Sequence, residues 1–213
     1  MSKITGPIAE LLAEDMSHVF EQMGYSFFKK GDFNLNIIGI RNRSGSAETF
    51  DDNVLVIYKV KSKWRVECYE VTTEPGTRIL KRPLKEVAHK GTAILVPGQY
   101  AGVYQIDWHG SKSKGHMALC QRGGKVKVWR DNNRDSKPDY HGPADEGWYG
   151  INIHRHRGSS AQVNTNGVSA GCQVFRSNTD FNNFMKTCEN AKKKWGNKFT
   201  YTLLTQSEIE DNL

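Results

Sequence analysis

From about residue 33 onward, the chain consists of short apolar runs separated by residues that favour turns, such as Pro97-Gly98 and Gly123-Gly124. Short strands with regular turn signals are typical of all-β domains, whereas a parallel βαβ fold needs helical patterns between its strands. The pattern therefore predicts a mainly β fold, either a β-sandwich or a closed sheet. The runs that we assign to strands are residues 54–60, 64–71, 92–96, 100–106, 116–121, 125–129, 148–154, 172–175 and 199–204.

Two other segments have the 3.6-residue periodicity of amphipathic helices. Residues 7–23 begin at Pro7 and stop before Gly24, and residues 179–194 end in three lysines, which suit the negative end of a helix. We expect an N-terminal helical extension over residues 1–32 that docks on one β-rich domain of residues 33–213. The apolar positions of the first helix are Ile8, Leu11, Leu12, Val19, Phe20 and Met23, and those of the second are Phe181, Phe184, Met185, Cys188 and Ala191.

The composition is that of an ordinary globular protein, with 213 residues, 37% hydrophobic residues and a formal net charge of +7. The longest apolar runs are far shorter than the roughly 20 residues of a membrane helix. Glu10, Glu14 and Asp15 interrupt any apolar segment of a signal peptide. We therefore expect cytoplasmic synthesis with no signal peptide, and no membrane insertion.

The four cysteines differ in their surroundings. Their spacing matches neither a zinc ribbon nor a Cys-x-x-Cys redox site, and without a secretion signal disulfides are not expected. Cys68, Cys120 and Cys188 lie among apolar neighbours, which favours inert core positions. Cys172 follows Ser169-Ala170-Gly171, and His154 ends a strand-like run 14 intervening residues before Ser169.

The chemistry of this segment suggests a nucleophile. An imidazole beside a thiol can lower the thiol pKa enough to form thiolate at neutral pH. Gly171 permits close approach of the backbone to a ligand, and the amides of Gly171 and Cys172 are candidate donors to an oxyanion. A cysteine and a histidine alone are also compatible with an inert core thiol.

The arrangement resembles the active-site signature of the L,D-transpeptidase family, in which a His and a loop precede Ser or Thr, His, Gly and Cys. The upstream hairpin and the segment 92–104 also look like that family, so the resemblance covers roughly residues 33–205. It is strongest for an uncharacterised, often phage-associated branch that reads Gly-Ile-Asn-Ile-His and Ser-Ala-Gly-Cys-Gln-Val-Phe. The resemblance implies a β-sandwich-like catalytic fold.

The resemblance also implies roles for individual residues. Cys172 would attack the meso-diaminopimelate carbonyl of a peptidoglycan stem peptide, and His154 would be its base. The backbone carbonyl of Arg155 would hold the second nitrogen of that histidine, which fixes the tautomer. Gly171 would shape the oxyanion site. The residues expected to contact the stem peptide or shape the loop around it are Ser169, Tyr149, Trp148 and Gln173. No cofactor and no metal are implied.

Two positions depart from the family pattern. Ala170 stands where the family has its second His, and Val174 stands where an Arg or Asn often follows the Cys. These departures leave formation of an acyl-enzyme plausible but put the second substrate in doubt. A transpeptidase must exclude water and receive an amine, whereas a hydrolase need only admit water. We therefore favour an L,D-carboxypeptidase or endopeptidase that acts at the bacterial cell wall over a cross-linking enzyme.

Other patterns support weaker hypotheses. His154-Arg155-His156 could offer two zinc ligands but lacks an evident third. The segment 131–139 has calcium-loop oxygens, yet Ser136 and Gly142 occupy positions that need Gly and Glu, so a polar turn is favoured. The basic stretch 112–134, with His109 before it and His116 within it, has no accompanying nucleic-acid motif, and we expect no nucleic-acid partner.

Two alternative classes stay open beside the enzyme: a non-catalytic wall-binding protein and a nucleic-acid-binding protein. Loss of turnover with retained binding in Cys172→Ala would separate the enzyme from the wall-binding protein. Steeply salt-dependent DNA retention without turnover would identify the nucleic-acid-binding protein. The oligomeric state does not follow from the sequence.

Overall fold

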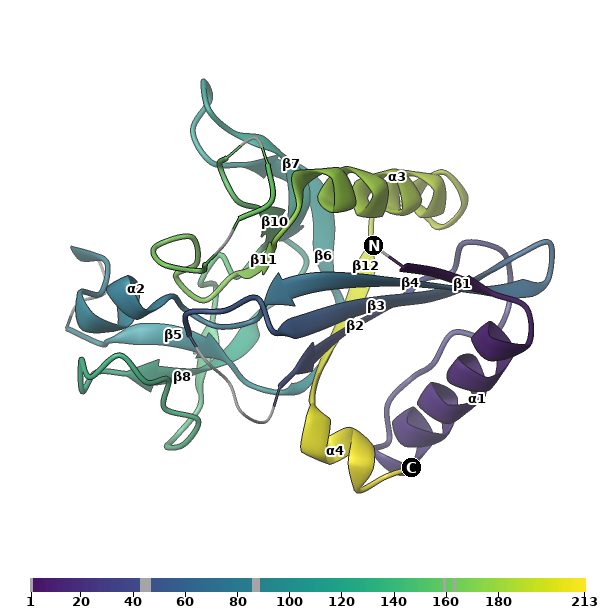
Figure 1. The fold of residues 1–213 in the computed structure, drawn as a ribbon, viewed down its shortest axis with the longest axis horizontal. Coiled ribbons are helices and arrows are strands. Elements are labelled where there is room, and N and C mark those ends of the chain that lie inside the picture. Colours follow the sequence, from purple (N-terminus) through teal and green to yellow (C-terminus); the bar gives the residue numbers. More distant parts are fainter. Residues whose placement is uncertain (1, 43–46, 86–88, 159, 163) are drawn as a thin grey trace.

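The computed structural model describes residues 2–42, 47–85, 89–158, 160–162 and 164–213. The fold is mainly β, with a large sheet, a small sheet and a few helices (Figure 1). In chain order the elements are β1 (Ser2–Thr5), α1 (Pro7–Gln22), β2 (Asn36–Arg41), β3 (Asp52–Val60), β4 (Lys63–Thr72), α2 (Thr77–Lys81), β5 (Thr92–Leu95), β6 (Gly98–His109), β7 (His116–Gln121), β8 (Val126–Asp131), β9 (Asp145–Gly147), β10 (Ile153–Arg155), β11 (Gln173–Phe175), α3 (Asn178–Trp195), β12 (Phe199–Thr205) and α4 (Gln206–Glu210).

The large sheet closes on itself. Its strands follow the order β1-β4-β11-β10-β7-β6-β12-β2-β3, and β3 also pairs with β4. Because β4 is ten residues long, its first half pairs with β1 and its end pairs with β11, while β3 lies along its other edge. Among the described strands of this sheet, β1 alone pairs on one side only, and closure gives the other strands partners on both sides. The mainly β expectation is confirmed, and the pairing is that of a closed, barrel-like sheet.

The core has two parts, one inside the closed sheet and one beneath α1. Helix α3 packs over the inner part with the face expected from the sequence, since Phe181, Phe184, Cys188 and Ala191 are all buried. Helix α1 packs outside the sheet, and the face expected from the sequence is confirmed at Val19 and Phe20 but not in the first turns. Ile8 and Leu11 are 63% and 58% exposed, whereas the small residues Ala9 and Ala13 are buried. Small side chains allow the helix to approach the strands closely.

The N-terminal segment and the sheet share this outer core. Strand β1 pairs with β4 in antiparallel register, and α1 packs against β4 and its neighbours. Val19 and Phe20 of the helix contact a cluster that includes Ile38 of β2 and Leu204 of β12. The division into residues 1–32 and 33–213 stays a prediction.

The small sheet has the order β5-β8-β9 and lies beside the closed sheet together with α2 (Figure 1). Ala93 and Leu95 of β5 and Val128 of β8 belong to the same buried cluster as the strands of the large sheet. The two sheets therefore share one core, and a cavity lined by residues of β5 and β8 lies at the boundary between them.

Most expected strands are present, but residues 148–152 are not a strand. Gly150 has a φ of +66°, and the amides of Tyr149 and Ile151 both donate to the side chain of Gln121 at 3.2 Å. The Gln121 side chain therefore accepts the hydrogen bonds of two backbone amides that would pair with a neighbouring strand if this segment were a strand. Strands β1, β2 and β9 and helices α2 and α4 were not assigned individually from the sequence.

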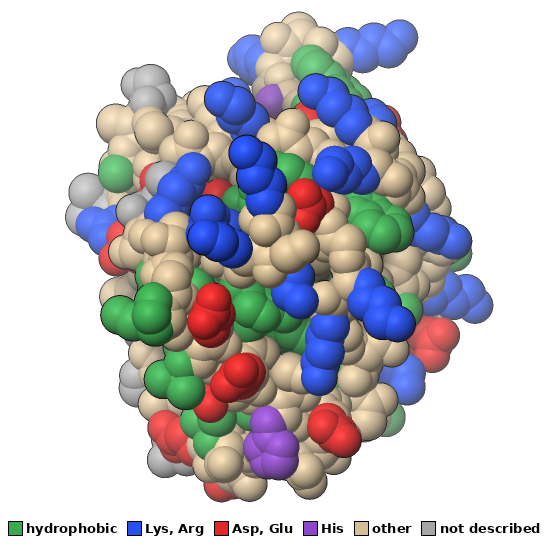
Figure 2. Space-filling view, turned by 90° about the vertical axis from the view of Figure 1, so that its right-hand side faces the viewer, with side chains coloured by type: hydrophobic (Ala, Val, Ile, Leu, Met, Phe, Trp, Pro, Cys, Tyr) green, Lys and Arg blue, Asp and Glu red, His purple; other side chains and the backbone are tan. Residues whose placement is uncertain are grey.

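The charged side chains are unevenly distributed. Figure 2 shows Lys and Arg gathered over one part of a face and acidic side chains over another. Lysines are exposed at the β3–β4 turn (Lys61, Lys63) and at the end of α3 (Lys193, Lys194). Among the described residues, the structure has no helix with both the length and the apolar character needed to cross a membrane.

Candidate active site

Cys172 lies on the wall of a cavity of about 310 Å³ at the junction of the two sheets. The volume is at the low end of the range for small-molecule sites, roughly 300–1,000 Å³. The thiol is partly exposed, unlike the buried thiols of Cys120 and Cys188. A small ligand can therefore reach it. The described lining residues are Ile79, Leu84, Thr92, Ala93, Arg130, Trp148, Tyr149, Gly150, Ile151, Ala170 and Cys172.

In this structure the thiol is hydrogen-bonded to the backbone of the neighbouring segment. Sγ of Cys172 donates to the carbonyl of Gly150 and accepts the amide of Asn152, both at 3.4 Å. Burial raises the pKa of Cys172 to about 11, although the Asn152 amide opposes this rise. The resting group is therefore a neutral thiol at neutral pH. Desolvation is the dominant influence on this thiol, and neither His154 nor Arg130 is among the groups that shift its pKa.

The turn before Cys172 depends on glycine. Gly171 has a φ of +115°, and a Cβ at this position would lie 2.3 Å from the carbonyl oxygen of Ala93. The Gly171 amide donates to Ser169 Oγ at 3.1 Å, and Ser169 Oγ donates to the Cys172 carbonyl at 2.8 Å. These two hydrogen bonds stabilise the turn, in agreement with the expected role of Ser169 in shaping the loop. Because the Gly171 amide donates to Ser169, it is not free in this structure to donate to an oxyanion.

His154 is held by the carbonyl that the resemblance implies. Its Nδ1 lies 2.7 Å from the Arg155 backbone oxygen, so the proton of the neutral ring is on Nδ1 and the lone pair is on Nε2. Burial lowers the pKa of His154 to about 3, with a further contribution from His109. The imidazole is therefore neutral at neutral pH, and in this resting arrangement it is a weak base, because its pKa lies far below the operating pH.

A second histidine, His109 of β6, lies directly against His154. Their ring centroids are 4.0 Å apart and the planes differ by 21°. Asn152 Oδ1 accepts the Gln121 amide at 2.8 Å, which orients the side chain so that Nδ2 donates to His109 Nδ1 at 3.0 Å. Burial also lowers the pKa of His109. The sequence suggested only surface or core roles for His109, because its neighbours in the chain do not indicate this contact.

Strands β10 and β11 bring Cys172 and His154 into the same region. They pair in parallel, with His154 opposite Val174, and the Gln173 amide donates to the Asn152 carbonyl at 2.9 Å. Cys172 is two residues before Val174, so it is a diagonal neighbour of His154. From a strand spacing of about 4.8 Å and a rise of about 3.3 Å per residue, their Cα atoms lie ~8 Å apart. Within the described part of the chain, the hydrogen bonds of Sγ go to Gly150 and Asn152, not to His154.

The remaining sequence-predicted residues divide between the cavity wall and the interior. Trp148 and Tyr149 line the cavity, and the Tyr149 ring stacks under Arg130 at 4.5 Å. Ser169 and Gln173 do not line it. Gln173 is fully buried and accepts the Tyr201 hydroxyl at 3.0 Å, because successive residues of a strand point to opposite faces. Their expected contact with a stem peptide stays a prediction, and both side chains are buried in this structure.

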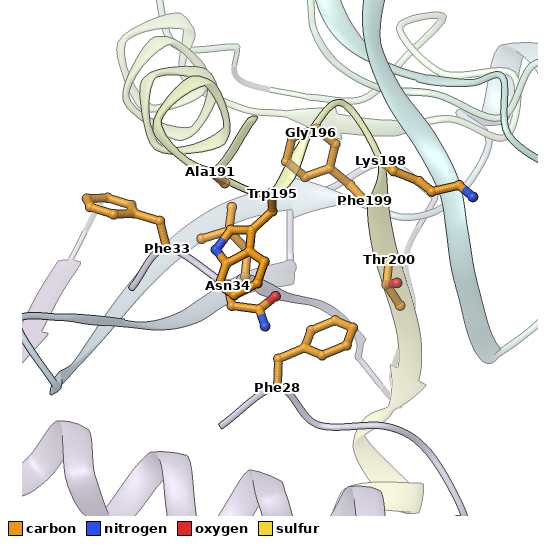
Figure 3. Close-up of a pocket in the computed structure, with 10 residues that line it drawn as sticks. Phe28, Phe33, Asn34, Ala191, Trp195, Gly196, Lys198, Phe199 and Thr200 are labelled. Carbon is orange, nitrogen blue, oxygen red and sulfur yellow. The ribbon is translucent and has the colours of Figure 1, made fainter. Parts of the chain in front are cut away.

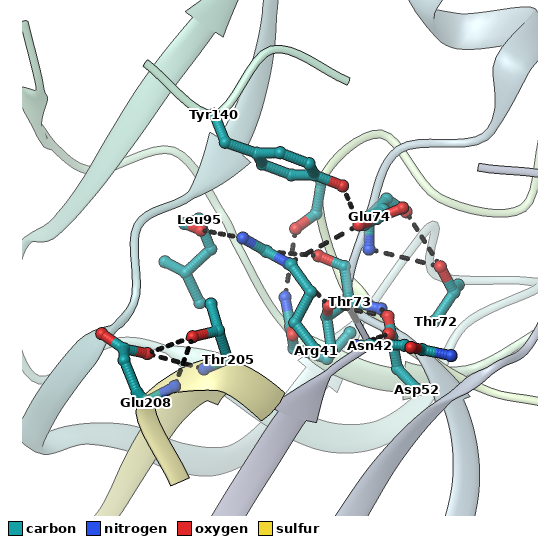
Figure 4. Close-up of polar contacts among 12 residues, drawn as sticks. Arg41, Asn42, Asp52, Thr72, Thr73, Glu74, Leu95, Tyr140, Thr205 and Glu208 are labelled. Carbon is teal, nitrogen blue, oxygen red and sulfur yellow. Dashed lines mark hydrogen bonds and ion pairs between the residues drawn. The ribbon is translucent and has the colours of Figure 1, made fainter. Parts of the chain in front are cut away.

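A buried polar cluster centred on Arg41 was also missed (Figure 4). Arg41 donates to Thr73 and to the Leu95 carbonyl, and its Nε lies 3.8 Å from Glu74. Tyr140 donates to Glu74, and Asp52 accepts two hydrogen bonds from Thr73. Burial and the charge of Asp52 raise the pKa of Glu74 to about 7. The cluster residues are far apart in the sequence, so no local motif indicated them.

A second cavity, of about 70 Å³, lies between the end of α3, the start of β12 and the segment before β2 (Figure 3). Phe28, Phe33 and Trp195 supply aromatic rings, and Lys198 supplies a charge. Its described lining residues include neither a cysteine nor a histidine. The cavity at Cys172 is therefore the better candidate for chemistry.

The structure also places the residues of the two metal hypotheses. His156 accepts the Gly158 amide at 2.9 Å, and His154 uses its Nδ1 on Arg155, so both rings are engaged locally. In the segment 131–139, Asp131 and Asp135 each accept a backbone amide of their own loop, as in a polar turn. Among the described residues, no group of three or more His, Cys, Asp or Glu is arranged to hold a metal ion.

Comparison of the chain with protein-family models, curated proteins and solved structures found no match.

Proposed function

We propose that this chain is a cysteine-dependent acyl-transfer enzyme with an L,D-transpeptidase-like catalytic fold, acting on peptidoglycan stem peptides at the cell wall. One observation carries the proposal. A partly exposed thiol lies on the wall of a cavity, beside a strand whose histidine is neutral and held in one tautomer by Arg155. The stem peptide as substrate comes from the sequence resemblance alone.

The chemistry requires the thiol to leave its resting contacts. Rotation about χ1 of Cys172 turns Sγ from Gly150 toward Nε2 of His154, which takes the thiol proton. The sulfur then attacks the meso-diaminopimelate carbonyl, the C–N bond breaks, and His154 returns the proton to the leaving amine. The Cys172 amide, which makes no hydrogen bond to the described residues, is the donor that we assign to the oxyanion.

We favour water as the acceptor of the acyl group. Ala170 lines the cavity next to Cys172 and offers no polar group to orient an incoming amine. Hydrolysis of the thioester needs only a water molecule that His154 can deprotonate.

Mass spectrometry of tetrapeptide muropeptides after incubation with the protein tests the proposal. Loss of the terminal D-Ala identifies a carboxypeptidase, splitting of cross-linked dimers identifies an endopeptidase, and new 3–3 dimers identify a transpeptidase. Cys172→Ala should abolish each of these, whereas the matched variant Cys68→Ala should not, because Cys68 lies outside the cavity. Binding of muropeptides without turnover, equal in wild type and Cys172→Ala, would contradict the enzymatic proposal in favour of a wall-binding protein.

A further inference from the structure

The cavity at Cys172 has apolar walls and a single charged group. Of its described lining residues, Arg130 alone carries a charge. Arg130 belongs to β8 of the small sheet, whereas Cys172 directly precedes β11 of the closed sheet. The cation and the thiol therefore face one cavity from two different sheets.

Arg130 is held in place but retains unused donors. Its Nε and Nη2 both point to one oxygen of Asp145, at 3.3 and 3.2 Å, and its guanidinium stacks on Tyr149. The side chain of Arg130 is 15% exposed and that of Asp145 is 40% exposed. A guanidinium has five N–H donors, so donors beyond the two given to Asp145 are available to a ligand. The stacking and the ion pair keep the group in one orientation.

The geometry points to a carboxylate subsite in which Arg130 binds a free carboxylate of the acyl donor, next to the carbonyl that Cys172 attacks. A planar carboxylate matches the guanidinium fork, and the apolar walls strengthen such a charge-assisted hydrogen bond. Asp145 already offsets part of the charge, which favours a monoanion over a phosphate. The role of the subsite in catalysis rests on the proposed function, but its preference for carboxylates does not.

Alkylation of Cys172 by iodoacetate and by iodoacetamide measures the preference directly. In both reactions the thiolate attacks the CH₂ carbon, an S–C bond forms, iodide leaves, and the thiol proton passes to solvent. The two reagents are nearly isosteric and differ in charge, so the ratio of their rates cancels the fraction of thiolate. Peptide mapping by mass spectrometry separates Cys172 from the other cysteines.

We expect Arg130→Gln to lower the iodoacetate-to-iodoacetamide rate ratio at Cys172 by about tenfold, the effect of one charge-assisted hydrogen bond. Lys127→Gln is the matched control, because it removes the same charge from an exposed position on β8, three residues away and on the other face. Asp145→Asn keeps Arg130 and frees its donors, so it should raise the ratio. This variant tests the subsite even where Arg130→Gln folds poorly.

A ratio that is unchanged in Arg130→Gln, or lowered equally by Lys127→Gln, would overturn the subsite. With muropeptides, Arg130→Gln should reduce the preference for a free over an amidated diaminopimelate carboxylate, chiefly through KM. If the alkylation ratio depends on Arg130 while wild type turns over no muropeptide, the carboxylate subsite stands and the proposed function fails. The two failures are thus distinguishable.

Discussion

The cavity around Cys172 and the cluster around Arg41 both contain polar groups in a largely apolar setting, but they differ in how those groups are satisfied. Three donors of Arg41 have acceptors, and Asp52 accepts from Asn42 and Thr73. At the other region the thiol makes two weak 3.4 Å contacts, and Nε2 of His116, near His154, has no partner among the described residues.

This difference in hydrogen bonding indicates a structural role for the Arg41 cluster and a reactive role for the thiol in the cavity. A buried ionic group that is fully partnered resists change, because removal of one partner leaves the other charge unpaired. A thiol with weak partners and access to a cavity can exchange them for a substrate. We therefore expect variants of the first region to lose stability and variants of the second to lose activity.

The largest effect is expected for Cys172→Ala. In the proposed mechanism Cys172 is the nucleophile, so its loss should reduce muropeptide turnover by about 10⁴-fold or more. The midpoint of thermal unfolding should change little, because the thiol contributes only two weak hydrogen bonds. Turnover assays combined with thermal melts check both parts. Residual activity near that of wild type would contradict the role of Cys172.

Arg41→Met should have the opposite profile. Removal of the guanidinium leaves Asp52 and Glu74 buried beside each other, at a cost of about 3–5 kcal/mol in the free energy of unfolding. Urea denaturation measures this loss. Arg176→Met is the control, because its ion pair with Glu70 is solvent-exposed and should contribute less than about 1 kcal/mol. Equal losses in the two variants would remove the distinction between the regions.

Gly171→Ala tests the turn that presents the thiol. The substitution forces a side chain into a positive-φ position and against the Ala93 carbonyl, so we expect a loss of about 3 kcal/mol, at the upper end for strain at one residue. Gly150→Ala is a useful comparison, because it also has a positive φ but no atom within 4 Å of the added Cβ. The smaller loss should be at Gly150, as measured by urea denaturation.

The free energy of unfolding should depend on pH with opposite signs for His154, near the thiol, and Glu74, in the Arg41 cluster. His154 has a pKa of about 3 in the folded chain against an ordinary value of 6.5, so the unfolded chain binds the proton first as the pH falls. Its contribution to stability is therefore lost from pH 6.5 toward pH 3, about 2 kcal/mol by pH 5. His154→Gln should flatten this loss.

Glu74 should act in the opposite direction. Its pKa is about 7 in the folded chain against 4.5 ordinarily, so the folded chain binds the proton first. Its contribution is present below pH 4.5 and is lost as the pH rises through 7, about 2 kcal/mol between pH 5 and pH 7. Glu74→Gln should therefore steepen the loss of stability on acidification. Unfolding free energies at pH 7 and pH 5 for both variants check these signs, and identical pH slopes would refute them.

Much of the fold followed from local patterns. The 3.6-residue repeat of 179–194 correctly identified the buried face of α3, and alternating apolar runs identified β3, β4, β6, β7 and β12. The repeat of α1 correctly predicted a helix and the burial of Val19 and Phe20, but it missed the buried alanines of the first turns, because alanine carries little hydrophobic signal. Residues 148–152 have the apolar pattern of a strand, but their amides donate to the side chain of Gln121 instead of a neighbouring strand. Gln121 is distant in sequence, so the local pattern could not indicate this contact.

The sequence by itself determined the strand-rich architecture, the glycine turn at Cys172 and the identity of the candidate pair Cys172 and His154, since these depend on spacing and residue type within short segments. Only the tertiary structure decided that the thiol is protonated, that His109 stacks on His154 and that Arg130 shares the cavity. Desolvation and contacts between separate strands set these properties, and neither is encoded in any one segment of the chain.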